Sequence, residues 1–228
     1  MVAKRVRRQP NDEIRDLADA YNRLYGLSEI RRNHYVTVNP MLAWAIAAEY
    51  EMLPDVSDDE RTSRCYLALE KEIVQQWLFI TEHGYVLEPW TQEGQPYADS
   101  EEMCNDLREN RHLYFFTGGE PHPLLNYRWS TTGYTGNEML RAIHDVFGHA
   151  AEGYGFGARG EENAWIHHSM MFTPDAQKAL TTETRGQNSW VNFGPFSDLP
   201  VTERPYADQK AALLPWWCCD WRHALKGN

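Results

Sequence analysis

Residues 143–157 read IHDVFGHAAEGYGFG and contain two histidines, His144 and His149. The spacing of a capping box at residues 135–138 predicts a helix that begins there and continues through this segment. On a regular helix the two imidazoles would lie about 140° apart, because each residue turns the chain by about 100°. They reach one metal ion only if the helix ends, bends or carries a π-bulge between them, and Gly148 is where such a distortion costs least. The segment therefore predicts either a distorted helix at a metal site or a polar stripe that faces solvent.

The rest of the chain is expected to be mainly α-helical with a few short strands. Apolar residues recur at the period of an α-helix, and capping residues, glycine or proline mark the ends of most of these segments. The expected helices lie at residues 11–26, 40–53, 57–84, 100–110 and 173–190, and the expected strands at residues 34–38, 85–87 and 112–119. No internal repeat or linker divides the chain. The sequence therefore predicts a basic flexible tail at residues 1–10 and a single globular catalytic domain at residues 11–228.

The charge of the chain excludes some classes of partner. Its 228 residues carry a formal net charge of -11, which argues against general affinity for nucleic acid or for anionic membrane surfaces. The exception is the basic tail, which is interpreted as a flexible terminus or, alternatively, as an arm that binds nucleic acid or a partner. No apolar run has the length of a membrane span, and the four cysteines form no CxxC pair. A cytoplasmic protein without a membrane partner is therefore expected.

A glutamate in a later helix is the candidate third ligand. Thr173 is a good N-cap and Pro174 suits the first helical position, so a helix is expected to begin here. Glu183 shares one face of this helix with apolar residues, namely Ala176, Ala179, Leu180 and Trp190. A carboxylate on such a face must be paired, protonated or bound to a metal. Arg185 is the alternative partner, but it points to the opposite side of the helix.

Two histidines and one carboxylate are the ligands of mononuclear non-haem Fe(II) oxygenases. The set leaves three coordination positions open for O2 and substrate. The sequence therefore predicts that His144, His149 and Glu183 bind Fe(II).

The segment HDVFGH at residues 144–149 resembles the HExxGH motif of the pterin-dependent aromatic amino acid hydroxylases. In that family both histidines bind iron, and a glutamate on a later helix completes the set. Glu183, with Thr181 two residues before it, is similar to the glutamate of that family's TxE segment. Asp145 stands where the family has an acidic residue beside its first ligand. The resemblance implies a fold like the catalytic core of that family, with Asp145 orienting a ligand or a bound water.

The resemblance also implies where a substrate would bind. Arg128 is similar to the arginine that holds the substrate carboxylate, and Thr135 is similar to the threonine that assists it, at a slightly shifted position. Trp129 and Trp165 would line the pocket for a ring. Gln187 lies one turn beyond the candidate glutamate, from where it would hydrogen-bond a ligand or the substrate.

The chain also departs from that family. The segment between the second histidine and the glutamate is shorter, and Arg185 replaces a phenylalanine. Residues 1–126 contain no segment that matches the family's pterin-stacking segment. Fe(II) is therefore the expected cofactor, whereas tetrahydropterin is implied by the resemblance alone.

The leading interpretation is an iron-dependent monooxygenase that hydroxylates an aromatic or amino-acid-like small molecule with O2. One alternative is an HD-type metal-dependent phosphohydrolase, because His144 and Asp145 form a histidine-aspartate dyad. A second alternative is a non-catalytic protein with a closed zinc site or no metal. His168 shares a helical face with apolar residues, so it is interpreted as a core histidine or as the partner of a metal ligand.

Overall fold

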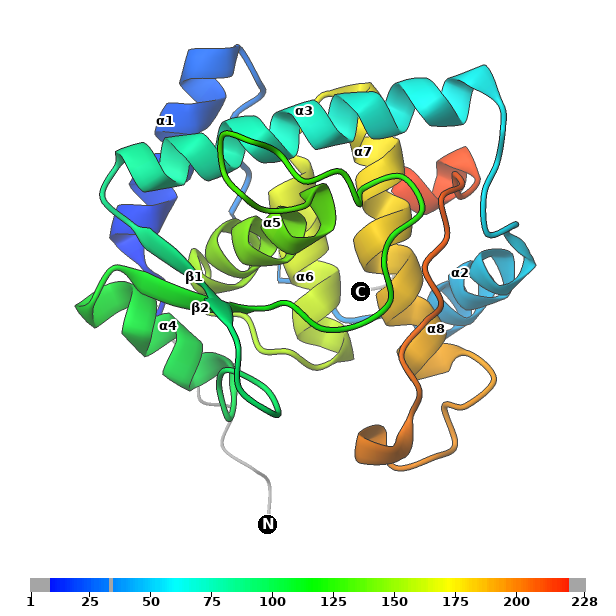
Figure 1. The fold of residues 1–228 in the computed structure, drawn as a ribbon. Coiled ribbons are helices and arrows are strands. Elements are labelled where there is room, and N and C mark those ends of the chain that lie inside the picture. Colours follow the sequence, from blue (N-terminus) through cyan, green and yellow to red (C-terminus); the bar gives the residue numbers. More distant parts are fainter. Residues whose placement is uncertain (1–8, 33–34, 222–228) are drawn as a thin grey trace.

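Helix α3 (Glu60–Glu82) is the longest helix of the described residues and crosses the upper side of the molecule in Figure 1. The computed structural model describes residues 9–32 and 35–221, so most of the predicted basic tail lies outside the described residues. α3 packs against α5 (Gly136–Ile143) and α7 (Pro174–Thr181). Together these helices enclose the main apolar core.

A second, smaller core lies where α2 (Pro40–Met52) and α8 (Gln187–Phe193) pack against each other. The other α-helices are α1 (Asp12–Tyr25), α4 (Ser100–Glu109) and α6 (Ala158–Ser169), and two short 3-10 helices are η3 (Val201–Glu203) and η4 (Trp216–Cys219). The described residues thus form a single compact, mainly helical domain, as the sequence predicts.

The sheet has two parallel strands, β1 (Val86–Trp90) and β2 (His112–Phe116). Parallel strands need a crossover, and α4 supplies it on the way from β1 to β2. Two of the three predicted strands are therefore confirmed. The third prediction is wrong for residues 35–38, which form no strand, and residue 34 lies outside the described residues.

Side-chain caps set the helix boundaries. Asn11 accepts a hydrogen bond from the backbone of Ile14 at the start of α1, and Gly26 ends that helix with φ at 67°. At the start of α3 the N-cap is Asp59, which accepts from Thr62, so the helix begins slightly later than predicted. Local sequence thus located these helices correctly to within a few residues.

Two helices are interrupted by π-helical segments. α5 continues directly into η1 (His144–Ala150), and α7 continues through η2 (Thr182–Gly186) into α8. η1 packs against α6, and η2 contacts both α6 and α2. These interruptions matter because η1 contains both candidate histidines and η2 contains Glu183.

Two general features of the chain concern membrane-spanning helices and disulfide bonds. Within the described residues, no helix combines the length and apolar character needed to cross a membrane. None of the four cysteines, Cys65, Cys104, Cys218 and Cys219, forms a disulfide bond within the part of the chain that the structure describes.

Candidate metal centre

The π-helical segment η1 brings His144 and His149 together. A π-helix closes hydrogen bonds between residues five apart, so residues at that spacing lie on the same side of it. The two ring centroids are 5.1 Å apart, and the rings are nearly perpendicular. The distortion that the spacing of the histidines requires is therefore confirmed.

Gly148 allows the His144 ring to lie against this segment. A Cβ atom at residue 148 would lie 3.0 Å from Nδ1 and 3.1 Å from Cε1 of His144, and 3.3 Å from the Cβ of Ala164. These separations are shorter than ordinary carbon contacts, so a larger side chain would displace the imidazole. Glycine is therefore favoured here by the packing of the His144 ring.

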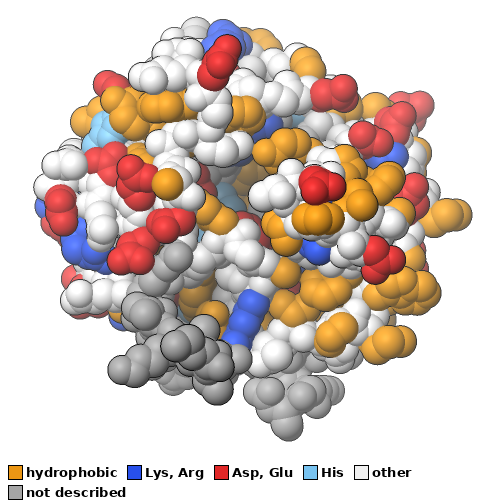
Figure 2. Space-filling view, turned by 90° about the horizontal axis from the view of Figure 1, so that it is seen from below, with side chains coloured by type: hydrophobic (Ala, Val, Ile, Leu, Met, Phe, Trp, Pro, Cys, Tyr) orange, Lys and Arg blue, Asp and Glu red, His pale blue; other side chains and the backbone are white. Residues whose placement is uncertain are grey.

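Glu161 of α6 supplies the carboxylate that meets the two histidines. Its Oε2 lies 3.2 Å from Nε2 of His149 and 3.6 Å from Nε2 of His144. The ligand atoms of these three residues all lie within 4.8 Å of one another. The side chain of His149 is buried, whereas that of Glu161 is 26% exposed, so the group is open on the glutamate side. Figure 2 shows a histidine side chain at the bottom of a hollow in the face seen from below.

The electrostatics of this group favour one carboxylate and one imidazolium. Burial opposes ionisation of Glu161, but the positive charge of His149 and the closeness of both imidazoles outweigh it and lower the pKa of Glu161 to about 2. Burial also opposes the charge of His149, but the nearby Glu161 carboxylate raises its pKa. Burial lowers the pKa of His144. Asp145, next in the chain, is so enclosed that burial raises its pKa to about 7. Ligands must lose their protons to bind a metal, so an incoming cation would displace the proton of His149.

Glu183 does not belong to this group. Its Oε1 accepts hydrogen bonds from the hydroxyl of Tyr66 and from Nε2 of His122, and its Oε2 accepts from Nε2 of Gln187. The structure thus differs from the predicted ligand set, since the carboxylate beside His144 is that of Glu161. A carboxylate on an apolar face needs partners, and the three hydrogen-bond donors supply them for Glu183.

Arg185 is engaged elsewhere, as its position on the helix predicts. Its guanidinium forms a buried, two-pronged ion pair with Glu162, donates to the carbonyl of Cys218 and lies over the ring of Trp165. Trp165 is itself buried and donates to Thr181. Trp165 therefore belongs to a packed core, not to the wall of an open pocket.

The other predicted substrate residues, Thr135, Arg128 and Trp129, make structural contacts around the start of α5. Thr135 caps α5 in the predicted capping box, and Arg128 pairs with it across a short β-bridge. The Arg128 side chain is 60% exposed and donates to the carbonyl of Gly133. Trp129 donates to Glu70 of α3. None of these contacts reaches His144 or His149, because the segment before α5 forms the start of that helix.

Glu161 is the site residue that the sequence did not reveal. It lies in the first turn of α6 beside Glu162, and the two adjacent glutamates have different partners. Acidic residues are common in first turns because they suit the helix dipole. The first-turn position therefore gives no sign that Glu161 is a candidate ligand, and only the packing of α6 against η1 distinguishes the two glutamates.

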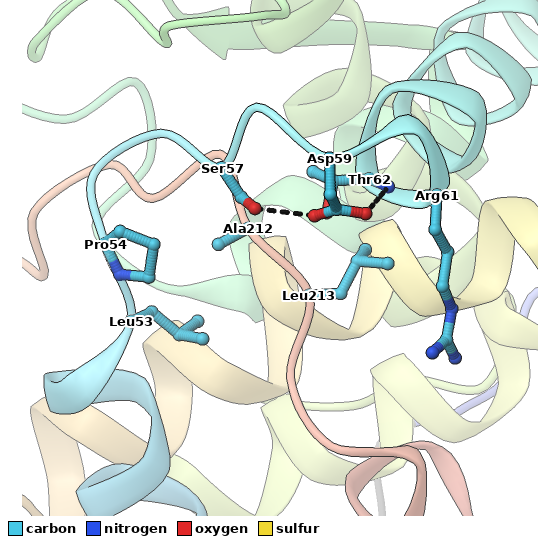
Figure 3. A pocket seen from close by; sticks show the side chains of 8 residues that line it. All are labelled: Leu53, Pro54, Ser57, Asp59, Arg61, Thr62, Ala212 and Leu213. Atoms are coloured by element: carbon cyan, nitrogen blue, oxygen red, sulfur yellow. Dashed lines mark hydrogen bonds between the residues drawn. The ribbon is translucent and has the colours of Figure 1, made fainter.

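A separate hollow lies at the start of α3 and is lined by residues from 53–62 and 212–213, none of which belongs to the histidine segment (Figure 3). Asp59 is its acidic residue, and this carboxylate already accepts hydrogen bonds from Ser57 and Thr62. Its remaining lining is mainly apolar. The hollow therefore contains no set of free chemical groups comparable to the histidine centre.

Comparison with known proteins yields no match to a family model, to a curated protein or to a solved structure. The resemblance of residues 144–149 and Glu183 to the aromatic amino acid hydroxylases therefore stays a prediction. The function of the chain is inferred from its own residues.

Proposed function

We propose that this protein is a mononuclear Fe(II)-dependent oxygenase whose iron is bound by His144, His149 and Glu161. The observation that carries the proposal is the convergence of two imidazole Nε2 atoms and one carboxylate oxygen. Nε2 of His144 fits a ligand role, because it is buried and has no hydrogen-bond partner among the described residues. Leaving such an atom unsatisfied costs free energy, and a bound cation would remove that cost.

The donor set favours iron over a closed structural site. Structural zinc sites have four protein ligands, whereas this group has three among the described residues. Three protein ligands would leave open positions, at which a bound Fe(II) would activate O2. An HD-type phosphohydrolase would instead need Asp145 beside His144 at the metal. Asp145 is not among the three grouped ligands, and the proposal therefore gives it the role of orienting a ligand or water.

The open side of the group suggests how a substrate would approach. Glu161 is the partly exposed ligand, and the ring of Phe156 lies 5.2 Å from that of His149. Phe156 is 43% exposed, so its ring can contact a molecule that enters from solvent. We infer a small aromatic or amino-acid-like substrate, with O2 as the co-substrate. Tetrahydropterin is the electron donor that the resemblance implies, and it is the first reductant to test.

The decisive experiment compares two glutamates. Protein purified without O2 is loaded with Fe(II), and the bound iron is counted in the wild type, in Glu161→Gln and in Glu183→Gln. We expect about one iron per chain in the wild type and a strong loss in Glu161→Gln. The Glu183→Gln variant should bind as much iron as the wild type, since Glu183 is hydrogen-bonded to other side chains. The opposite result would restore the ligand set that the sequence predicts.

Activity distinguishes the remaining candidates. Iron-loaded protein should consume O2 when a reductant and aromatic substrates are supplied. Tight zinc binding without O2 consumption would indicate a structural site or a zinc hydrolase. Phosphatase activity with Mn(II) would support the HD-type alternative. Failure of the wild type to take up any metal would refute the proposal itself.

A further inference from the structure

A chain of buried polar groups lies behind His144. Its Nδ1 is 3.1 Å from Nδ1 of His168, and Nε2 of His168 is 2.9 Å from Oε1 of Gln76. The amide nitrogen of Gln76 in turn donates to the carbonyl of Met171 at 3.1 Å. His168 and Gln76 are both completely buried. The contacts connect the long helix α3 to the candidate metal centre through two imidazoles.

The backbone carbonyl of Met171 fixes the orientation of Gln76. A carbonyl only accepts hydrogen bonds, so the group that faces it must be the NH2 of Gln76. The amide oxygen of Gln76 then faces His168 and is itself an acceptor. Nε2 of His168 must therefore carry the hydrogen of that contact.

The protonation of His168 then determines that of His144. A doubly protonated His168 would be a fully buried cation between an amide and an imidazole, which desolvation strongly disfavours. A neutral imidazole with its hydrogen on Nε2 has a lone pair on Nδ1. The hydrogen between the two rings therefore belongs to Nδ1 of His144, and Nε2 of His144 is left with its lone pair.

We propose that Gln76 is a positioning residue that acts through His168 to keep Nε2 of His144 free of hydrogen and available to a metal. The inference deepens the proposed metal site and rests on it for its purpose. Nε2 of His144 is the atom that faces Glu161, at 3.6 Å. The tautomer itself is a property of the metal-free protein, so it can be measured whether or not a metal binds.

Without Gln76 the opposite arrangement becomes accessible. His168 could then carry its hydrogen on Nδ1 and donate to His144. The hydrogen of His144 would move to Nε2, where it blocks the proposed metal-ligating atom. Loss of such a supporting partner typically weakens metal affinity by about 10–100-fold, and we expect this loss in Gln76→Leu.

The first test reads the tautomers directly in the metal-free wild type. Protein labelled with 15N-histidine is studied by two-bond 1H-15N correlation spectroscopy, with His144→Gln and His168→Gln used to assign the signals. We expect His144 to be protonated on Nδ1 alone and His168 on Nε2 alone. Protonation of His144 on Nε2, or a doubly protonated His168, would overturn the inference. Because no metal is present, this result is independent of the proposed function.

The second test measures the consequence for Fe(II) affinity under anaerobic conditions. Gln177→Leu is the matched control, because the side chain of Gln177 also donates to a backbone carbonyl of this segment, that of Phe172, and the hydrogen-bond partner of Nε2 of His168 is Gln76. We expect Gln76→Leu to bind Fe(II) 10–100-fold more weakly than the wild type, and Gln177→Leu to bind it normally. Equal loss in both variants, or no loss in Gln76→Leu, would overturn the positioning role. If Gln76→Leu fails to fold, the tautomers of His144 and His168 measured in the wild type still decide whether the inference holds.

Discussion

Replacing Gly148 by alanine tests whether the His144 ring is held by close packing against η1. The added methyl group would approach two ring atoms of His144 at 3.0 and 3.1 Å. Relative to glycine, alanine gains about 0.5–1 kcal/mol in a helix, because it loses less backbone freedom on folding. Overpacking of a filled core costs about 1–3 kcal/mol. The free energy of unfolding should therefore fall by no more than about 2.5 kcal/mol.

Metal binding should be affected more than stability. The ring of His144 can relieve the contact only by moving a few tenths of an ångström, and this changes where its Nε2 points. We expect the affinity for Fe(II) to fall by about 10–100-fold, as when the support of a ligand is lost. The assay is an anaerobic Fe(II) titration beside a thermal melt. For a chain of this size, each kcal/mol corresponds to roughly 2–4 °C in the melting temperature.

A matched glycine provides the control. Gly157 precedes α6, and a Cβ atom there would meet nothing within 4 Å. Gly157→Ala should therefore bind Fe(II) like the wild type. The packing argument is refuted if Gly148→Ala also binds Fe(II) normally, because the His144 ring would then have room to accept a methyl group without being displaced.

Two further substitutions test the packing around η2. Arg185→Met should lower the free energy of unfolding by about 3–5 kcal/mol, because it leaves Glu162 buried without its partner. In urea denaturation, the double variant with Glu162→Gln should recover part of this loss. If the losses of the two single variants simply add in the double variant, the pairing is contradicted. Gly186→Ala would place a Cβ atom 2.6 Å from the ring of Tyr50, so we expect a loss of about 3 kcal/mol or more. A wild-type melting temperature in Gly186→Ala would show that Tyr50 moves freely.

The local parts of the fold could be predicted because local chemistry determines them. The capping box at Thr135 and the glycine at residue 26 have the predicted roles in the structure. The distortion of η1 was one of two alternatives that the sequence left open, since two histidines five residues apart converge only if the helix is distorted. In contrast, residues 35–38 have β-type side chains but no strand beside them. Strand formation depends on a partner that lies elsewhere in the chain.

The candidate carboxylate ligand could not be predicted for a similar reason. Glu183 looks like a ligand in the sequence because it falls on an apolar face. That observation establishes only that the carboxylate must be satisfied, and the groups that satisfy it come from distant segments, Tyr66 of α3 and His122 of a loop. Glu161 has an ordinary first-turn position, so nothing in its local sequence marks it. Tertiary packing alone decides which glutamate faces the histidines.

The two π-helical segments share a physical arrangement that bears on function. In each, a glycine lies where a Cβ atom would press on an aromatic or imidazole ring: His144 at Gly148, and Tyr50 at Gly186. Each segment also places a buried ionisable side chain in a network with other polar groups, His149 with Glu161 and Glu183 with His122. A regular helix with alanine at these positions would be locally more stable. Features that oppose local stability in this way are expected at functional sites. The network around Glu183 therefore shares this feature of functional sites with the candidate metal centre, although its carboxylate lies outside the proposed ligand set.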